Sequence, residues 1–214
     1  MKNKFGFVSL TGRTNVGKST LLNSFFQKKI AITSRKPQTT RNRILGILSE
    51  KDSQIVFLDT PGVHLGYKRQ LNKVMNKIAS HCYEEVDLVL FLIDRLKWQK
   101  EEENILNRLK TLNKPVVLVI NKIDRLKDKT KLLAFIKDIS QKFNFLSIIP
   151  ISALKKDNLL ELKKIILNNL DSGPFHFPDD SITEFSDNFY ISEIIREKAI
   201  CLLYTSPSPR DRYI

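Results

Sequence analysis

Apolar residues along the chain follow two alternating patterns, short continuous runs and longer segments in which they recur every three or four positions. The short runs are typical of buried strands, and the periodic segments are typical of amphipathic helices. Their alternation predicts βαβ units and an α/β fold, a doubly wound sheet of about six strands with helices on both faces. Strands are expected over 5–10, 43–48, 54–58, 86–93, 115–120 and 145–151, and helices over 18–27, 67–85, 101–112, 130–143 and 159–170.

The pattern changes after residue 170. Prolines, aspartates and a glycine within 171–180 predict a linker over 171–189. Helical periodicity returns over 190–203, and the prolines that follow exclude a regular element in the last ten residues. One domain of about 170 residues, a linker and a short appendage are therefore expected.

Composition narrows the class of protein. With 42% apolar and 28% charged residues, wholesale disorder is excluded, and no apolar run is long enough for a transmembrane helix. Two cysteines without a CxxC pair argue against a disulfide scaffold or a zinc site, so a cytoplasmic protein is expected. The net charge is +17 over residues 1–170 and −4 over 171–214. A polyanionic partner such as RNA, an anionic membrane surface or a lysine-rich composition explains this charge equally well.

Residues 12–19, GRTNVGKS, fit the phosphate-binding pattern GxxxxGK[ST] between a predicted strand and a predicted helix. Glycines permit the close backbone approach that phosphate needs, and the loop amides with the helix N-terminus cradle it. Lys18 is expected to contact the β- and γ-phosphates, and the Ser19 hydroxyl to coordinate Mg²⁺. The expected contacts in this loop are Gly12, Arg13, Thr14, Asn15, Val16, Gly17, Lys18, Ser19 and Thr20.

A second motif, DTPG, begins at Asp59, directly after the predicted strand 54–58. An apolar strand that delivers an aspartate to a loop is the Walker B arrangement, in which the carboxylate holds Mg²⁺ through water. The Gly62 amide can bind the γ-phosphate, so that hydrolysis releases the segment that follows. The expected contacts are Asp59, Thr60, Pro61, Gly62 and Val63.

The third and fourth motifs, NKID and SA, follow the predicted strands 115–120 and 145–151. Asp124 can accept both N1–H and N2–H₂ of guanine, and adenine offers no such pair of donors. Asn121 can tether neighbouring loops, the stem of Lys122 can lie over the base, and the Ala153 amide can reach guanine O6. The expected contacts are Asn121, Lys122, Ile123, Asp124, Ser152 and Ala153.

Together these motifs resemble those of the translation-factor class of P-loop GTPases. The segments at 12–23, 33–41, 59–64, 121–124, 150–153 and 192–198 are similar to Era-type GTPases in particular. The resemblance implies a P-loop NTPase fold, a G domain over 1–170 and the hydrolysis of GTP to GDP and phosphate with Mg²⁺. It also implies a role in small-ribosomal-subunit assembly through 16S rRNA.

Further residue roles follow from the resemblance alone. Thr40 matches the switch threonine that binds Mg²⁺, with Thr39 as the alternative, so Lys18, Thr40 and Gly62 are the expected catalytic residues. Asn15 matches an asparagine that coordinates K⁺ in related GTPases, although a loop residue that tolerates a left-handed conformation is another interpretation. Val63 stands where Ras-like enzymes place a water-orienting glutamine, which predicts slow hydrolysis raised by K⁺ or a partner.

The resemblance ends near residue 200. Residues 190–200 match the start of a KH-type RNA-binding domain, 201–214 match nothing in it, and the glycines contain no GxxG pair. The implied partners are small-subunit rRNA and the pre-30S particle, bound weakly by a monomer that lacks the KH domain. Peripheral contact with the inner face of the membrane is left open. Another ribosome- or tRNA-modification GTPase, or a GTP-gated binding module without turnover, is the alternative function.

Overall fold

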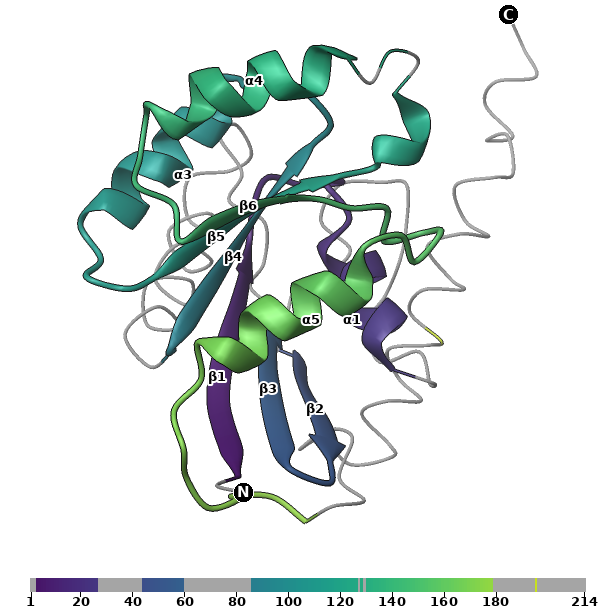
Figure 1. Cartoon of the computed structure of the whole chain (residues 1–214), viewed down its shortest axis with the longest axis vertical. Helices are drawn as coiled ribbons and strands as arrows, with labels where there is room; N and C mark the ends of the chain where they lie inside the picture. Colours follow the sequence, from purple (N-terminus) through teal and green to yellow (C-terminus); the bar gives the residue numbers. More distant parts are fainter. Residues whose placement is uncertain are drawn as a thin grey trace, which may run out of the picture.

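A computed structural model of the chain describes residues 3–26, 44–59, 86–126, 128, 130–178 and 195, with the backbone alone at 44, 45 and 59. Its six strands form one sheet in the order β2-β3-β1-β4-β5-β6, so the predicted α/β sheet is confirmed (Figure 1). The strands are β1 (Lys4–Thr11), β2 (Ile44–Glu50), β3 (Ser53–Asp59), β4 (Leu88–Asp94), β5 (Val116–Asn121) and β6 (Ser147–Pro150).

The order of the strands positions a binding edge. All neighbouring strands are parallel except β2, which pairs antiparallel with β3 because only Lys51 and Asp52 join them. β3 and β4 lie on opposite sides of β1, so the winding direction of the sheet reverses at β1. Ligands of open α/β sheets bind at the carboxyl ends of the strands at such a reversal.

Helices cover both faces of the sheet, as predicted. In Figure 1, α1 and α5 lie over one face, and α3 and α4 lie over the other. Alternate residues of β4 pack toward opposite faces: Leu90 shares a hydrophobic cluster with Leu162 of α5, and Phe91 shares one with Leu106 of α3. None of the described helices is long and apolar enough to cross a membrane. The helices are α1 (Lys18–Phe25), α3 (Lys100–Lys110), α4 (Thr130–Ser140) and α5 (Leu159–Asn168).

Element boundaries differ from the prediction around α4 and β6. The predicted helix 130–143 ends at Ser140, and the predicted strand 145–151 is limited to Ser147–Pro150. Phe143 and Phe145 account for the difference, because their rings contact each other edge to face at 5.0 Å and pack on the core from a loop. The predicted helix 67–85 and the apolar segment 190–203 fall outside the described residues, apart from the single position 195.

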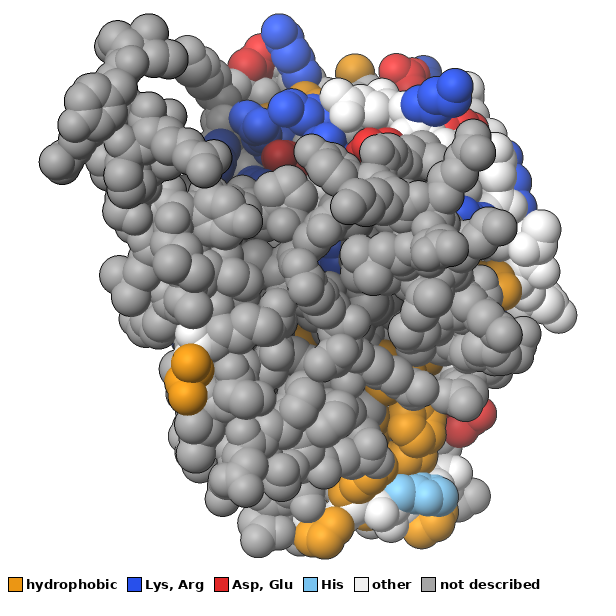
Figure 2. Space-filling view, turned by 180° about the vertical axis from the view of Figure 1, so that it is seen from behind, with side chains coloured by type: hydrophobic (Ala, Val, Ile, Leu, Met, Phe, Trp, Pro, Cys, Tyr) orange, Lys and Arg blue, Asp and Glu red, His pale blue; other side chains and the backbone are white. Residues whose placement is uncertain are grey.

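Residues 171–178, the first part of the predicted linker, lie against the end of the sheet opposite the binding edge. The Phe5 amide donates to the Asp171 carbonyl at 3.1 Å, and the Gly173 amide donates to the Asn3 carbonyl at 2.9 Å. Phe5 also stacks on His176, with ring centroids 4.3 Å apart. Figure 2 shows apolar side chains gathered with a histidine at the lower end of the molecule.

Candidate nucleotide-binding site

The backbone of residues 12–17 forms a tight loop that only glycine permits at two positions. Gly12 has φ +147° and Gly17 has φ +106°. A Cβ on Gly12 would lie 2.4 Å from the Leu92 carbonyl oxygen, and one on Gly17 would lie 2.3 Å from Asn121 Nδ2. Neither contact is sterically possible, so both glycines are required for the loop to pass this close to β4 and β5.

Lys18 lies at the start of α1 with its side chain folded back into the loop. It is 7% exposed, and its Nζ donates to the carbonyl oxygens of Gly12 and Arg13, both at 3.0 Å. The first turn of α1 contains no acidic residue, and Gly17 caps it without a side chain. The helix N-terminus and a buried ammonium therefore converge on the loop, an arrangement that favours an anion.

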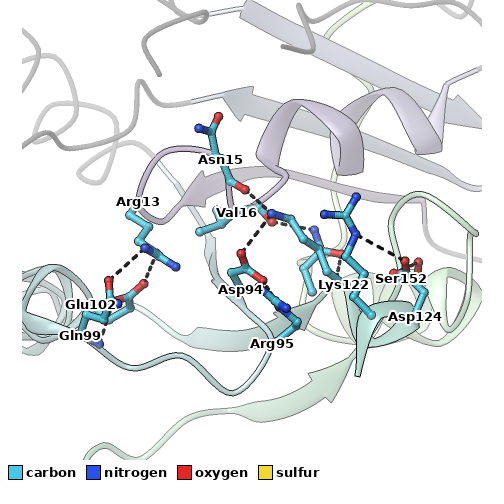
Figure 3. Close-up of polar contacts among 12 residues, drawn as sticks. Arg13, Asn15, Val16, Asp94, Arg95, Gln99, Glu102, Lys122, Asp124 and Ser152 are labelled. Atoms are coloured by element: carbon cyan, nitrogen blue, oxygen red, sulfur yellow. Dashed lines mark hydrogen bonds and ion pairs between the residues drawn. The ribbon is translucent and has the colours of Figure 1, made fainter. Parts of the chain in front are cut away.

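The second half of the loop is held from β5. Asn121 is 1% exposed, and its Nδ2 donates to the Val16 carbonyl at 2.8 Å. Lys122 Nζ donates to the Asn15 carbonyl and lies 3.2 Å from Asp94 Oδ2. Figure 3 shows the Asn15 side-chain amide directed away from Lys122, while the main-chain carbonyl faces it. Residues at the ends of β4 and β5 thus fix the carbonyls of two loop residues.

The first half of the loop is held from α3. Arg13 Nε lies 2.7 Å from Glu102 Oε1, and Arg13 Nη1 donates to Gln99 Oε1 at 3.1 Å. Glu102 Oε2 also accepts a hydrogen bond from the backbone N–H of Gln99 at 3.0 Å, which closes a capping box at the start of the helix. The Arg13 side chain points toward α3, on the opposite side of the loop from Lys122 (Figure 3).

Asp124, Ser152 and Ala153 meet at the carboxyl ends of β5 and β6. Ser152 Oγ donates to Asp124 Oδ1 at 2.7 Å, which orients the carboxylate. The Ala153 amide donates to Asn121 Oδ1 at 3.0 Å, within the protein, where the sequence predicted an amide available to guanine O6. Asn121 therefore joins two loops through one buried amide, because its Nδ2 binds the phosphate loop and its Oδ1 binds the 152–153 loop.

The electrostatic environment of Asp94 favours its ionised form. Burial by itself raises the pKa of Asp94, but the hydrogen bond from Arg95 at 2.8 Å and the charge of Lys122 outweigh it. The pKa therefore lies below its ordinary value. A stable negative charge at the end of β4 keeps the Lys122 ammonium beside the loop.

Asp59 is the last residue of β3 and pairs in register with Leu10, two residues before Gly12. With Ser19 in the first turn of α1, this places a carboxylate-bearing and a hydroxyl-bearing residue near the phosphate loop. Oxygen donors of this kind, together with phosphates, match the preference of Mg²⁺. The predicted contacts at Thr39 and Thr40, and at Thr60, Pro61, Gly62 and Val63, lie outside the described residues.

Four residues of this network were absent from the predicted site, namely Asp94, Arg95, Gln99 and Glu102. Asp94 carried a signal, because it ends an apolar strand in the same way as Asp59. Gln99 and Glu102 show the spacing of a capping box, which predicts a helix start but gives no indication of contact with residue 13.

One family model and several known proteins are similar to this chain. A family model described as a 50S ribosome-binding GTPase matches residues 7–122. GTPase Era of Haemophilus influenzae (strain PittGG) is 51% identical over 90% of the chain, and GTPase Era of Histophilus somni (strain 129Pt) is similar to the same extent. The chain spans 64% of the length of each of these two relatives.

Two solved structures are similar over nearly the whole chain. One is Era in complex with MgGDPNP and nucleotides of 16S ribosomal RNA, with a TM-score of 0.89 and 43% identity over 97% of this chain and 69% of that one. The other is a variant of Aquifex aeolicus Era bound to GDP and AlF4⁻, with a TM-score of 0.88 and 43% identity, covering 96% and 69%. The similarity therefore extends from sequence to fold.

Proposed function

The chain belongs to the Era family of GTPases, and on that premise we propose that it binds GTP and hydrolyses it to GDP and phosphate. The observation that carries the proposal is the position of Asn121. Its buried side chain binds Val16 in the phosphate loop at 2.8 Å and Ala153 beside the predicted base-reading Asp124 at 3.0 Å. The proposed phosphate site and the proposed guanine site are thus linked by one side chain, which supports a ligand that carries both groups.

The phosphates are proposed to lie over residues 12–20. Lys18, now bonded to the carbonyls of Gly12 and Arg13, would extend its ammonium to the β- and γ-phosphates. Ser19 and Asp59 would hold Mg²⁺, which neutralises phosphate charge when it is bound. Thr40 and Gly62 are proposed to sense the γ-phosphate.

Guanine specificity is proposed to come from Asp124, which Ser152 holds at 2.7 Å. Asp124→Asn replaces one of the two oxygens that accept N–H groups with an NH₂ group that donates. We expect GDP affinity to fall about 100-fold, as for the loss of a charge-assisted bond pair, and preference to move to xanthosine diphosphate. Competition titration with both nucleotides measures the change. Ser152→Ala is the control, because it keeps the carboxylate and should lower GDP affinity less than tenfold without a change of base. Unchanged GDP preference in Asp124→Asn would exclude Asp124 from base recognition.

Hydrolysis is proposed to be slow, since Val63 cannot orient water, and to be raised by K⁺ held at Asn15. The test is multiple-turnover phosphate release from GTP in K⁺ and in Na⁺, with Lys18→Ala as a variant that lacks the phosphate-binding charge. We expect faster release in K⁺, and equal rates in both salts in Asn15→Ala. Equal rates in the unaltered protein would remove the K⁺ part of the proposal. Tight GTP binding without turnover would instead indicate a GTP-gated binding module.

The proposed partners are small-subunit ribosomal RNA and the pre-30S particle, in the cytoplasm, with peripheral membrane contact as a secondary location. The proposal of an RNA partner rests on a related Era structure that contains 16S rRNA nucleotides, and the charge of +17 over residues 1–170 provides the positive charge that phosphate contacts require. Residues 1–170 are proposed as the G domain of a monomer, 171–189 as a linker, 190–200 as the start of a KH-type domain and 201–214 as a non-matching tail. Phosphate release with and without small-subunit rRNA tests the partner, and a K⁺-stimulated rate that does not change when the RNA is added would exclude an effect of this RNA on hydrolysis by the chain.

A further inference from the structure

The carboxylate of Glu102 on α3 is buried, and its two oxygens contact two different residues. The residue is fully buried, at 0% exposure, so its charge requires a partner inside the protein. Oε2 accepts a hydrogen bond from the backbone N–H of Gln99 at 3.0 Å and caps α3, while Oε1 lies 2.7 Å from Nε of Arg13 in the phosphate loop. The start of α3 and the start of the loop therefore share one buried negative charge.

Arg13 is directed toward both acceptors at the start of this helix. Its Nε lies beside Glu102 and its Nη1 donates to Gln99 at 3.1 Å, so the planar fork of the guanidinium spans two side chains one helical turn apart. The side chain is 17% exposed and points away from the loop interior (Figure 3). The Arg13 carbonyl, by contrast, accepts Lys18 Nζ at 3.0 Å. Residue 13 thus lies between α3 on its outer side and the phosphate-binding ammonium on its inner side.

The rest of the loop is fixed from a different direction. Asn121 holds the Val16 carbonyl, and Lys122 holds the Asn15 carbonyl, both from the end of β5. Arg13 connects the opposite half of the loop to the start of α3. Since amides of a phosphate loop act only when they are aimed at the phosphate, both halves must be held.

We propose that Glu102 is a positioning residue for nucleotide binding, which acts by holding Arg13 and thereby the first half of the phosphate loop, and that Arg13 is not itself a phosphate ligand. The proposal rests on the proposed GTP-binding function. It assigns to α3 an influence on the affinity for the β-phosphate that acts through Arg13.

The test is titration of the full chain with GDP and with GMP in Mg²⁺ buffer. GMP lacks the β-phosphate that the loop holds but keeps the base contacts, so the ratio of the two affinities separates loop position from general folding. Glu102→Gln and Arg13→Gln are each expected to weaken GDP binding about tenfold and GMP binding less than twofold. The double variant should be no weaker than either single variant, because both remove the same link.

Glu103→Gln is the matched control on the same helix. Glu103 pairs with Trp98 Nε1 at 2.6 Å and with Lys142 at 3.4 Å rather than with the loop, so GDP affinity should change less than twofold. Where Glu102→Gln does not fold, Arg13→Lys decides the question. Lysine keeps the charge but cannot span Glu102 and Gln99, so the same tenfold loss is expected.

Three outcomes would overturn the inference. Unchanged or tighter GDP binding in Glu102→Gln, with weaker binding in Arg13→Gln, would make Arg13 a direct phosphate ligand. Equal losses for GDP and GMP would indicate a general contribution to folding, and GDP binding unchanged in Arg13→Lys would show that a point charge suffices. Failure of the unaltered protein to bind GDP is distinct from these, because it would overturn the proposed function and the inference together.

Discussion

Among single residues, Asp94 determines where the Lys122 ammonium lies. It is the last residue of β4, which is otherwise apolar. Its carboxylate accepts hydrogen bonds from Arg95 Nε at 2.8 Å and from Lys122 Nζ at 3.2 Å. Lys122 in turn holds the Asn15 carbonyl in the phosphate loop. The Asp94 carboxylate can therefore influence the shape of the phosphate loop without contacting the nucleotide, because Lys122 lies between the carboxylate and the loop.

The lowered pKa of Asp94 makes its contribution to stability dependent on pH. A group with a folded-state pKa below its unfolded value stabilises the fold above the unfolded pKa, and this is lost as pH falls through the folded pKa. The loss should therefore occur below about pH 4. Asp94→Asn should lower the free energy of unfolding by about 1 kcal/mol at pH 7 and make it less sensitive to acid. Urea unfolding at pH 7 and in the acid range measures both.

Asp138→Asn is the control for this pH dependence, because Asp138 is exposed on α4. It should leave both the stability at pH 7 and its fall in acid within about 0.5 kcal/mol of the unaltered protein. Identical acid sensitivity in Asp94→Asn and in the unaltered protein would show that other carboxylates account for the pH dependence.

For whole elements, the sequence predicted existence and type better than boundaries. All six strands were predicted, because continuous apolar runs such as that in β4 leave little choice once both faces are covered. The ends of α4 and β6 were not, since Phe143 and Phe145 are apolar without being in a regular element. The motifs placed Asp124 and Ser152 among the expected contacts of one guanine base, and in the structure the two side chains are 2.7 Å apart. The contact of Arg13 with Gln99 spans 86 positions and has no local signal.

The phosphate loop, as an element, depends on Gly17 at its junction with α1. Gly17→Ala would place a Cβ 2.3 Å from Asn121 Nδ2 at φ +106°. Either the loop or Asn121 must move, so we expect a loss of about 2–3 kcal/mol of unfolding free energy and at least a tenfold loss of GDP affinity. Thermal unfolding and GDP titration measure the two effects.

Gly173→Ala provides the matched control, because its Cβ would meet only Phe5 Cβ at an ordinary 3.9 Å. Its stability and GDP affinity should stay within about 0.5 kcal/mol and twofold of the unaltered protein. A Gly17→Ala protein that matched this control would show that the junction accommodates a side chain, contrary to the structure.

At the scale of the whole molecule, β3 connects the two ends of the sheet. It begins at Ser53 and ends at Asp59 on the nucleotide edge. Gln54, its second residue, is fully buried and binds the segment 171–178. Gln54 Oε1 accepts the amides of His176 and Phe177, both at 3.1 Å, and its Nε2 donates to the Phe177 carbonyl at 2.9 Å. One side chain thus satisfies three backbone groups of the chain where it leaves the proposed G domain.

Gln54→Ala should release residues 171–178 without disturbing the nucleotide site. Three backbone groups lose their partner, and the loss of about 1–3 kcal/mol should raise the population of the open segment. Chymotryptic cleavage in this segment should then be about tenfold faster, while GDP affinity stays within twofold because the phosphate loop lies at the other end of the sheet. Ser49→Ala is the control, since it removes only the hydroxyl that Gln54 Nε2 meets at 3.0 Å and keeps the contacts to 176 and 177. Cleavage at the same rate in Gln54→Ala and Ser49→Ala would mean that the stacking of His176 on Phe5 holds the segment, and that Gln54 only fills a buried position.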